Sequence, residues 1–263
     1  MKITFLIDNK TESTECNAEW GLSMLIEANG EKILMDQGAS PMLVRNAKNM
    51  GLDLGEVDFA AISHGHNDHT GGTEYFFEVN DHAPVYIHRD AFLPHYNGTE
   101  KYIGLDTALE HQPRIVFTEN EYRIEENMTL FSCSDRTGKH SFGSFGLTEK
   151  VDSRFLPDDF RHEQYLLIRE NDRRILFSGC SHKGILDITE WFEPDVLIGG
   201  FHFSKMECSE VLADAARHLA SRPTRYYTCH CTGNEQFRYM KQYMNDLHYL
   251  SCGETVELHL TED

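Results

Sequence analysis

Residues 64–72 read HGHNDHTGG, and this stretch decides how the rest of the chain is interpreted. It places three imidazoles and one carboxylate within six positions, directly after the apolar run FAAI at residues 59–62. Neutral imidazole and carboxylate are ligands that suit zinc, iron or manganese. A strand that ends at Ser63 delivers these side chains to a loop at the edge of a sheet, where the chain can surround an ion. The stretch therefore predicts a metal site rather than a histidine-rich surface loop.

The spacing within the stretch predicts two ions. His64 and His66 are two positions apart, so in an extended segment they point the same way and can share one ion. Asp68 and His69 lie beyond a turn and cannot easily join the same tetrahedral shell. They fit a second ion close to the first. We expect two divalent ions, with zinc favoured over iron or manganese.

The HxHxDH pattern followed by Gly71-Gly72 resembles the metal signature of the metallo-β-lactamase superfamily. A related redox branch, the flavodiiron proteins, carries Glu at the position of His66, so the histidine here favours hydrolytic chemistry. The resemblance implies an α/β fold of the αββα sandwich type, in which the metals sit at one edge between two sheets. Periodicity alone predicts only a mixed α/β sheet.

Length and composition agree with one catalytic domain over residues 1–263. The chain lies within the range of large single-domain α/β folds, and 40% hydrophobic residues with 16 Phe and 11 Tyr suffice for a sizeable core. The balance of 24 basic and 43 acidic residues gives a net charge of −19. Such a surface repels polyanions, which argues against a nucleic-acid role. We expect a small-molecule substrate.

Cysteine usage and the first residues predict a cytoplasmic protein. Seven cysteines are an odd count, and the start MKITFLID is strand-like and lacks the apolar region of a signal peptide. No stretch approaches the ~18 apolar residues that span a membrane. We therefore expect reduced thiols and no membrane partner.

Strand-like and helix-like segments alternate along the chain. We expect an antiparallel strand pair joined through Asn171-Asp172, and a helix that Ser40-Pro41 opens and Gly51 closes. Ser204 and Glu207 are expected to form the capping box of another helix. The expected strands cover residues 2–8, 21–27, 32–35, 59–63, 84–88, 114–117, 128–132, 164–169, 174–177, 195–198, 225–229 and 255–260, and the later helices residues 207–220 and 235–247.

Three histidine-bearing motifs follow predicted strands in the second half of the chain. They read FSGCSH at residues 177–182, GGFH at 199–202 and CHCTG at 229–233. Because the carboxyl ends of parallel strands meet at one edge of a sheet, these motifs are expected to join the first-half cluster. His182 can supply a third imidazole to the first ion.

The resemblance extends to these motifs. In the superfamily a bridging Asp follows a strand that ends in Gly, and Cys180 stands at that place; it is either a thiolate ligand or a small buried residue beside the site. His230 resembles the last metal ligand of the family. His202 is expected to contact the substrate or donate a proton, as second-half histidines do elsewhere in the superfamily.

One branch of the superfamily is matched in particular. The order CxH at residues 180–182, GGxH at 199–202 and HCTG at 230–233 resembles the group typified by the dihydropterin-forming synthase of methanopterin biosynthesis. The early segments Asp8-Asn9, Gly21-Leu22-Ser23 and Asp36-x-Gly38 agree with it. The similarity covers nearly the whole chain.

Several other polar residues and thiols near these motifs are expected to lie beside the metal ligands or away from them. His162 lies where the family places another histidine but lacks its Pro-Gly-His turn, so it is expected on the surface, and His140 stays unassigned. Asp36 is expected to brace the metal loop through hydrogen bonds. Asp8 and Asn9 either line the same edge or form an ordinary turn. Because alternate residues of a strand face opposite sides, Cys229 and Cys231 are expected to point away from His230 as structural thiols.

The first functional hypothesis is a binuclear metal-dependent hydrolase of an ester, thioester or phosphoester in a small anionic substrate. A bound ion lowers the pKa of water to about 7, and Asp68 can orient that nucleophile and shuttle its proton. The second hypothesis is a pterin-linked synthase, which joins a pterin precursor to a phosphorylated aromatic amine. The third is a non-catalytic metal-binding or sensing module. Residues 90–146 are expected to cover the substrate.

Overall fold

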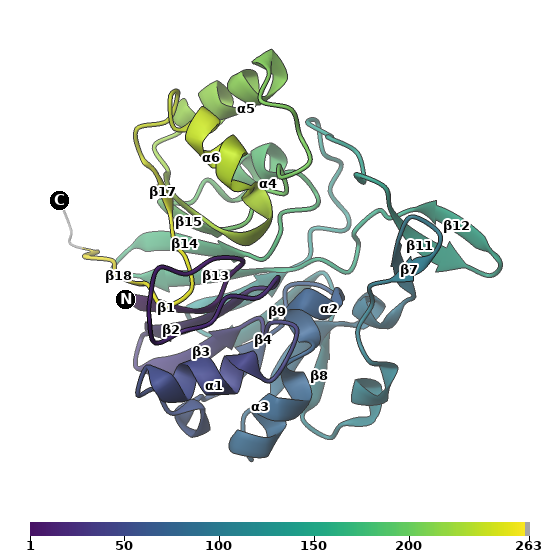
Figure 1. Ribbon diagram of the computed structural model, residues 1–263, viewed down its shortest axis with the longest axis vertical. Coiled ribbons are helices and arrows are strands. Elements are labelled where there is room, and N and C mark those ends of the chain that lie inside the picture. Colours follow the sequence, from purple (N-terminus) through teal and green to yellow (C-terminus); the bar gives the residue numbers. More distant parts are fainter. Residues whose placement is uncertain (261–263) are drawn as a thin grey trace.

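The protein folds into two β-sheets that pack face to face, with helices on both outer sides (Figure 1). The computed structural model describes residues 1–260. One buried cluster joins residues of both sheets, including Phe5 and Met35 from the first and Leu166, Phe177 and Ile198 from the second. The structure therefore has the four layers of the predicted αββα sandwich.

The first sheet comes from the N-terminal half, with one C-terminal strand at its edge. Its early strands pair antiparallel, and those from β3 onward pair parallel. Helices α1 (Met42–Asn49) and α3 (Thr73–Val79) pack on its outer face through Leu43 and Phe76. In spatial order the strands are β18 (Thr255–Glu257), β1 (Lys2–Ile7), β2 (Ser23–Ala28), β3 (Glu31–Met35), β4 (Phe59–Ala61), β5 (Val85–His88) and β8 (Ile115–Thr118).

The second sheet repeats this arrangement, and its four strands from Arg173–Ser178 to Leu247–Tyr249 pair parallel. Its outer face is covered by α4 (Ile185–Phe192), α5 (Glu210–Ala220) and α6 (Asn234–Met240). In spatial order the strands are β17 (Leu247–Tyr249), β16 (Arg225–Thr228), β15 (Val196–Gly199), β14 (Arg173–Ser178), β13 (Tyr165–Glu170), β10 (Met128–Phe131) and β9 (Glu121–Glu125).

A small third sheet projects from the side of the sandwich (Figure 1). Tyr96, Tyr102 and Phe155 pack their rings edge to face within it. The third sheet lies partly within residues 90–146, the segment that we expect to cover a substrate. Its strands are β12 (Arg154–Pro157), β11 (Leu147–Val151), β6 (His95–Asn97) and β7 (Lys101–Tyr102).

Two predicted helix features are wrong. The helix expected over residues 235–247 ends at Met240, because Leu247 begins strand β17, which pairs parallel with β16. The capping box of Ser204 and Glu207 does not form, since α5 begins at Glu210 with Ser209 as its N-cap. The turn at Asn171-Asp172 joins β13 and β14 as predicted, with both residues at positive φ. Within residues 1–260, no helix combines the length and apolar character needed to cross a membrane.

We expect Leu166→Ala to lower the free energy of unfolding by about 2–5 kcal/mol, because it opens a cavity in the core between the two sheets. Val211→Ala is the matched control, since Val211 is 60% exposed on α5 and its truncation removes little buried surface. Urea unfolding of the two variants measures the difference. Equal effects would contradict a core at this position.

Candidate metal centre

The histidine-rich motif spans a change in backbone conformation. His64 lies in a bend after β4, and the extended residue His66 is the N-cap of the short helix α2 (Asn67–Thr70), which carries Asp68 and His69. The two predicted ligand pairs are thus separated by the start of a helix. Gly72 permits the Gln37 backbone to approach closely, because a Cβ at Gly72 would lie 1.9 Å from the carbonyl oxygen of Gln37.

The first group of ligand-type side chains contains His64, His66 and His182. One ligand atom from each lies within 4.8 Å of the others, and all three residues are buried. The Nε2 atoms of His64 and His182 are 3.3 Å apart. Two imidazole nitrogens at this distance, pointing at each other in a buried site, can share one ion. The structure therefore brings His182 to the first-half motif as predicted.

The second group contains Asp68, His69 and His230, again with ligand atoms within 4.8 Å of one another. His230 Nε2 lies 3.5 Å from Asp68 Oδ2. Burial raises the pKa of the Asp68 carboxyl, but the charges of His69 and His230 outweigh burial and hold that pKa well below its usual range. Asp68 is therefore a carboxylate, the form that can bind a cation.

Cys180 lies between the two groups. Its Sγ is 3.3 Å from His69 Nε2, and it forms one candidate cluster with His64 and His69 and another with His230 and Cys231. Burial raises the pKa of the Cys180 thiol well above its ordinary value. A thiolate at this position thus requires a nearby cation, which is the condition a metal ion meets.

The chemistry of these residues fits divalent cations. Burial lowers the pKa of His64, His66 and His182 well below the ordinary value, so these imidazoles are neutral, the form that binds a metal. In the described part of the chain, His66 Nε2, His182 Nδ1 and His230 Nε2 are buried nitrogens with no hydrogen-bond partner. Buried polar atoms of this kind are rare unless a ligand satisfies them.

Asp36 braces the metal loop as predicted. Its Oδ2 lies 2.7 Å from His69 Nδ1 and accepts a hydrogen bond from the Ser63 hydroxyl, while Oδ1 accepts from the Ser63 backbone N–H. The same hydroxyl lies 2.8 Å from His64 Nδ1. One buried carboxylate thereby fixes the orientation of a histidine in each group.

Asp8 and Asn9 line the sheet edge that carries the candidate metal groups, rather than forming only an ordinary turn. Asp8 Oδ1 accepts a hydrogen bond from the backbone N–H of His230, and Asn9 Oδ1 lies 2.8 Å from His230 Nδ1. His230 has φ +44°, a left-handed conformation that few side chains adopt. These contacts hold that conformation, so the end of β1 positions the last histidine of the site.

Trp20 is a site residue that sequence reasoning missed. Its indole Nε1 donates a hydrogen bond of 2.8 Å to Asp68 Oδ2, and its ring centroid is 5.2 Å from that of His230. The side chain is 59% exposed, although it contacts the buried centre. A lone tryptophan before Gly21 carries no motif that would have indicated this contact.

His202 lies against the first group. Its ring centroid is 4.2 Å from that of His182 and 5.0 Å from that of Phe145. Burial and the charge of Lys205 lower the pKa of His202 to about 4, so the ring is neutral at neutral pH. This position beside His182 is compatible with contact to a bound substrate.

Two expectations about neighbouring residues are wrong. His162 is fully buried rather than on the surface, because the turn before β13 packs under the motif and the Gly65 backbone N–H donates to His162 Nδ1 at 3.0 Å. Cys231 turns toward the site, with Sγ 3.5 Å from the carbonyl oxygen of Cys180. Residues His230–Thr232 form a 3-10 helix, so strand alternation does not apply to them.

Two further side chains lie elsewhere. Cys229 is buried in the core between the sheets, as predicted for a structural thiol. His140 contacts His218 and lies 3.5 Å from the Glu190 carboxylate. It therefore belongs to a surface ion-pair group and not to the candidate metal centre.

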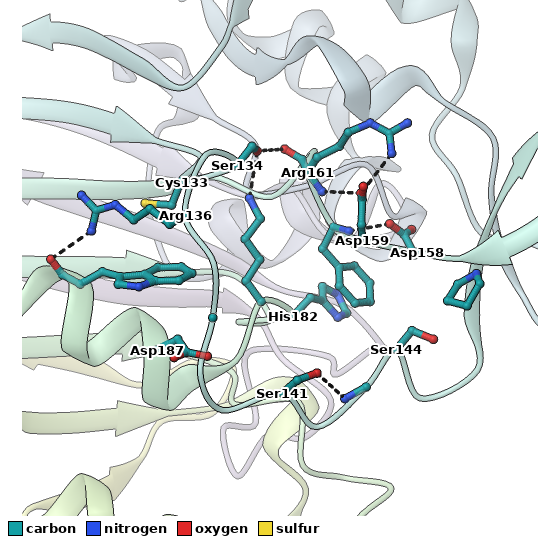
Figure 2. A pocket seen from close by; sticks show the side chains of 16 residues that line it. Cys133, Ser134, Arg136, Ser141, Ser144, Asp158, Asp159, Arg161, His182 and Asp187 are labelled. Carbon is teal, nitrogen blue, oxygen red and sulfur yellow. Dashed lines mark hydrogen bonds and ion pairs between the residues drawn. The ribbon is translucent and has the colours of Figure 1, made fainter.

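A cavity of about 490 Å³ opens beside His182. Figure 2 shows Arg136, Arg161 and Asp187 around it, together with His182, the member of the first group that lines the cavity. Lys183 also lines it, and its ammonium donates to the Ser134 hydroxyl and the Glu163 carbonyl. The cavity has both polar and apolar walls, lies next to the first group through His182, and is large enough for a small molecule.

We expect the metal-free protein to lose stability as the pH falls from about 6.5 toward 4. Burial, with the charge of His95 or Lys205, lowers the pKa of His162 and of His202 to about 4. An unfolded histidine titrates near 6.5, so within this window the unfolded chain binds protons that the folded chain does not. The stabilisation from these two histidines is fully present above pH about 6.5, their pKa in the unfolded chain. It is lost as the pH falls through about 4, their pKa in the folded protein.

Urea unfolding of chelator-treated protein at pH about 7 and about 5 measures this loss. His202→Asn removes one of the titrating rings and is expected to flatten the dependence. A free energy of unfolding that does not change between the two pH values would contradict the prediction.

Comparison with known proteins assigns the class. A family model described as the metallo-beta-lactamase superfamily matches residues 21–222, and the chain belongs to this superfamily. Its relatives also bear out the resemblance to the pterin-synthase branch, since it is 25% identical over 266 residues to the 7,8-dihydropterin-6-methyl-4-(beta-D-ribofuranosyl)-aminobenzene-5'-phosphate synthase of Methanocaldococcus jannaschii. That match covers 91% of this chain and 90% of the synthase.

Two further relatives cover almost the whole chain. The uncharacterised protein MJ0448 of Methanocaldococcus jannaschii is 28% identical over 264 residues, with 97% of this chain and 99% of that protein covered. The crystal structure of Tm1679, described as a metal-dependent hydrolase of the beta-lactamase superfamily, has a TM-score of 0.83 and 26% sequence identity. It covers 98% of this chain and 99% of its own.

Proposed function

We propose that this protein is a binuclear metal-dependent hydrolase that cleaves an ester, thioester or phosphoester bond in a small anionic substrate. The observation that carries the proposal is the pair of adjacent ligand groups, with Cys180 between them. His64, His66 and His182 would hold the first ion, and Asp68, His69 and His230 the second. Cys180, whose sulfur lies between the two groups, would be a further ligand. Imidazole with thiolate favours zinc, and iron or manganese remain alternatives.

The ions would supply polarisation of the scissile bond and a water with its pKa lowered to about 7. Asp68 would orient that water and take its proton, and the Trp20 N–H fixes the carboxylate for this role. His202, neutral at pH 7, would donate a hydrogen bond to the substrate or its leaving group. The cavity beside His182 would hold the rest of the substrate, with Arg136 at its wall.

Hydrolysis of a panel of phosphoesters, thioesters, lactones and lactams by zinc-, iron- and manganese-loaded protein tests the proposal. We expect turnover with one bond class, lowered about 10²-fold in kcat by His202→Ala. Fully metal-loaded protein that turns over none of the panel would overturn the hydrolase and leave the synthase and the non-catalytic module.

A pterin-linked synthase is the second candidate, favoured by the identity to the pterin synthase over 90% of that enzyme. It predicts a product only when a pterin precursor and a phosphorylated aromatic amine are supplied together. Product formation from the pair without hydrolysis of either partner alone would select this candidate over the hydrolase.

A further inference from the structure

A second buried polar cluster lies behind His66. It contains His66, His95, Asp158 and His162, and one ligand-type atom from each lies within 4.8 Å of the others. All four residues are buried, with His95 and His162 completely so. They come from the metal motif, from strand β6 and from the turn before β13, so the fold assembles the cluster from three separate segments.

Asp158 is the centre of this cluster. Its Oδ2 lies 2.8 Å from His95 Nδ1 and 3.4 Å from His162 Nε2, and its Oδ1 accepts a hydrogen bond from the Phe160 backbone N–H. A buried carboxylate without such donors would be costly. The His95 imidazole and the Phe160 backbone amide therefore hold Asp158 in one orientation, and His162 Nε2 lies within ion-pair range of the carboxylate without forming a hydrogen bond to it.

The protonated nitrogen of His162 follows from its other contact. The Gly65 backbone N–H donates to His162 Nδ1 at 3.0 Å, so the lone pair of that nitrogen is engaged. In a neutral imidazole the proton then resides on Nε2, which faces Asp158. His162 thus has no free lone pair for an ion. The cluster is organised as a carboxylate held by imidazole donors and not as a four-ligand cation site.

His66 belongs both to this cluster and to the first candidate metal group. An imidazole has two nitrogens that face different directions, so one can bind an ion while the other faces a carboxylate. The His66 Nε2 atom is buried and has no hydrogen-bond partner among residues 1–260. The ring centroids of His95 and His162 lie 5.8 and 5.5 Å from that of His66, so both rings lie beside it.

We propose that Asp158, held by His95 and His162, is a positioning carboxylate that orients His66 for the first ion. The proposal rests on the metal centre of the proposed function. A carboxylate or carbonyl behind a metal-binding histidine fixes its orientation and raises its basicity, and removing such a partner typically weakens metal binding or activity about 10–100-fold. Asp36 performs the same task directly for His69 in the second group, whereas it reaches His64 of the first group only through the Ser63 hydroxyl.

Asp158→Asn tests the proposal, with Asp81→Asn as the matched control. Asp81 also lies beside a histidine, 3.3 Å from His82 Nδ1, but this pair is exposed and outside the site. We expect competition with a chromophoric chelator to show one of two zinc ions bound about 10–100-fold more weakly in Asp158→Asn, and both unchanged in Asp81→Asn. The absorption of the cobalt-substituted protein should change only in the first variant.

A second pair of variants keeps the test decisive if Asp158→Asn does not fold. His95→Asn retains an N–H where His95 Nδ1 donates, whereas His95→Leu removes it. Zinc affinity close to that of the unchanged protein in His95→Asn, and weakened in His95→Leu, supports the proposal. Equal affinities in both variants would overturn it.

The remaining outcomes separate this proposal from the proposed function. Two tightly bound ions in Asp158→Asn, with unchanged affinity, would overturn the positioning role and leave the binuclear centre intact. Three ions in the unchanged protein and two in Asp158→Asn would make the cluster a third cation site, contrary to the proposal. No bound ion in the unchanged protein would overturn the metal centre itself.

Discussion

His66→Ala is expected to lower kcat/KM at least about 10³-fold, equivalent to about 4 kcal/mol of lost transition-state stabilisation. The side chain lies in the first group with His64 and His182 and also contacts the cluster around Asp158. Its removal takes one ligand from the ion that would activate the nucleophile. Steady-state kinetics on the substrate found in the hydrolysis panel, with metal content measured on the same samples, tests this.

His111→Ala is the control for this experiment, because His111 is exposed at the end of a 3-10 helix outside the candidate centre. It should keep the activity and metal content of the unchanged protein. Unchanged turnover in His66→Ala would show that the reaction does not use the first group. It would also remove the principal support for a hydrolase.

Removal of the two ions is expected to lower the melting temperature by about 16–32 °C. The centre buries five histidines that have no cation to bind in the metal-free protein. Each ion, present at about 1,000 times its dissociation constant, adds about 4 kcal/mol to the folded state, and the two together add about 8 kcal/mol. In a protein of this size each kcal/mol shifts the melting temperature by roughly 2–4 °C.

Calorimetry of metal-loaded and chelator-treated protein measures this shift, and zinc added back after removal of the chelator should reverse it. His230→Ala, which loses a ligand of the second group, should show a smaller difference between the two states. Identical melting temperatures with and without the ions would contradict a structural contribution from the metal centre.

Local sequence was sufficient to predict the first half of the candidate centre. His64 and His66 just before the short helix, and Asp68 and His69 on it, lie within six positions, so their separation depends only on the backbone between them. The bracing role of Asp36 was also predictable, since polar residues after adjacent parallel strands meet at one edge. The layered fold followed from the resemblance rather than from periodicity.

The parts that were predicted incorrectly depend on local backbone conformation. Cys231 was expected to face away from the metals because alternation in a strand was assumed, but His230 has positive φ and starts a 3-10 helix. His162 was expected on the surface because it lies between Arg161 and Glu163. A tight turn instead buries it under the metal motif.

The parts that were missed depend on contacts between distant segments. His95 and Asp158 are 63 positions apart, and their hydrogen bond exists because β6 pairs with β11 beside the turn that carries Asp158. Trp20 reaches Asp68 across 48 positions. Neither contact has a sequence pattern of its own, so only the folded chain reveals them.

The binuclear centre is tested most directly by the metal content per chain, measured by elemental mass spectrometry on protein purified without chelator or histidine tag. Two equivalents are expected, falling to one or fewer in His182→Ala and in His230→Ala, which remove a ligand from the first and second group respectively. A single equivalent that both variants retain, or no bound metal in the unchanged protein, would contradict the centre built on residues 64–69.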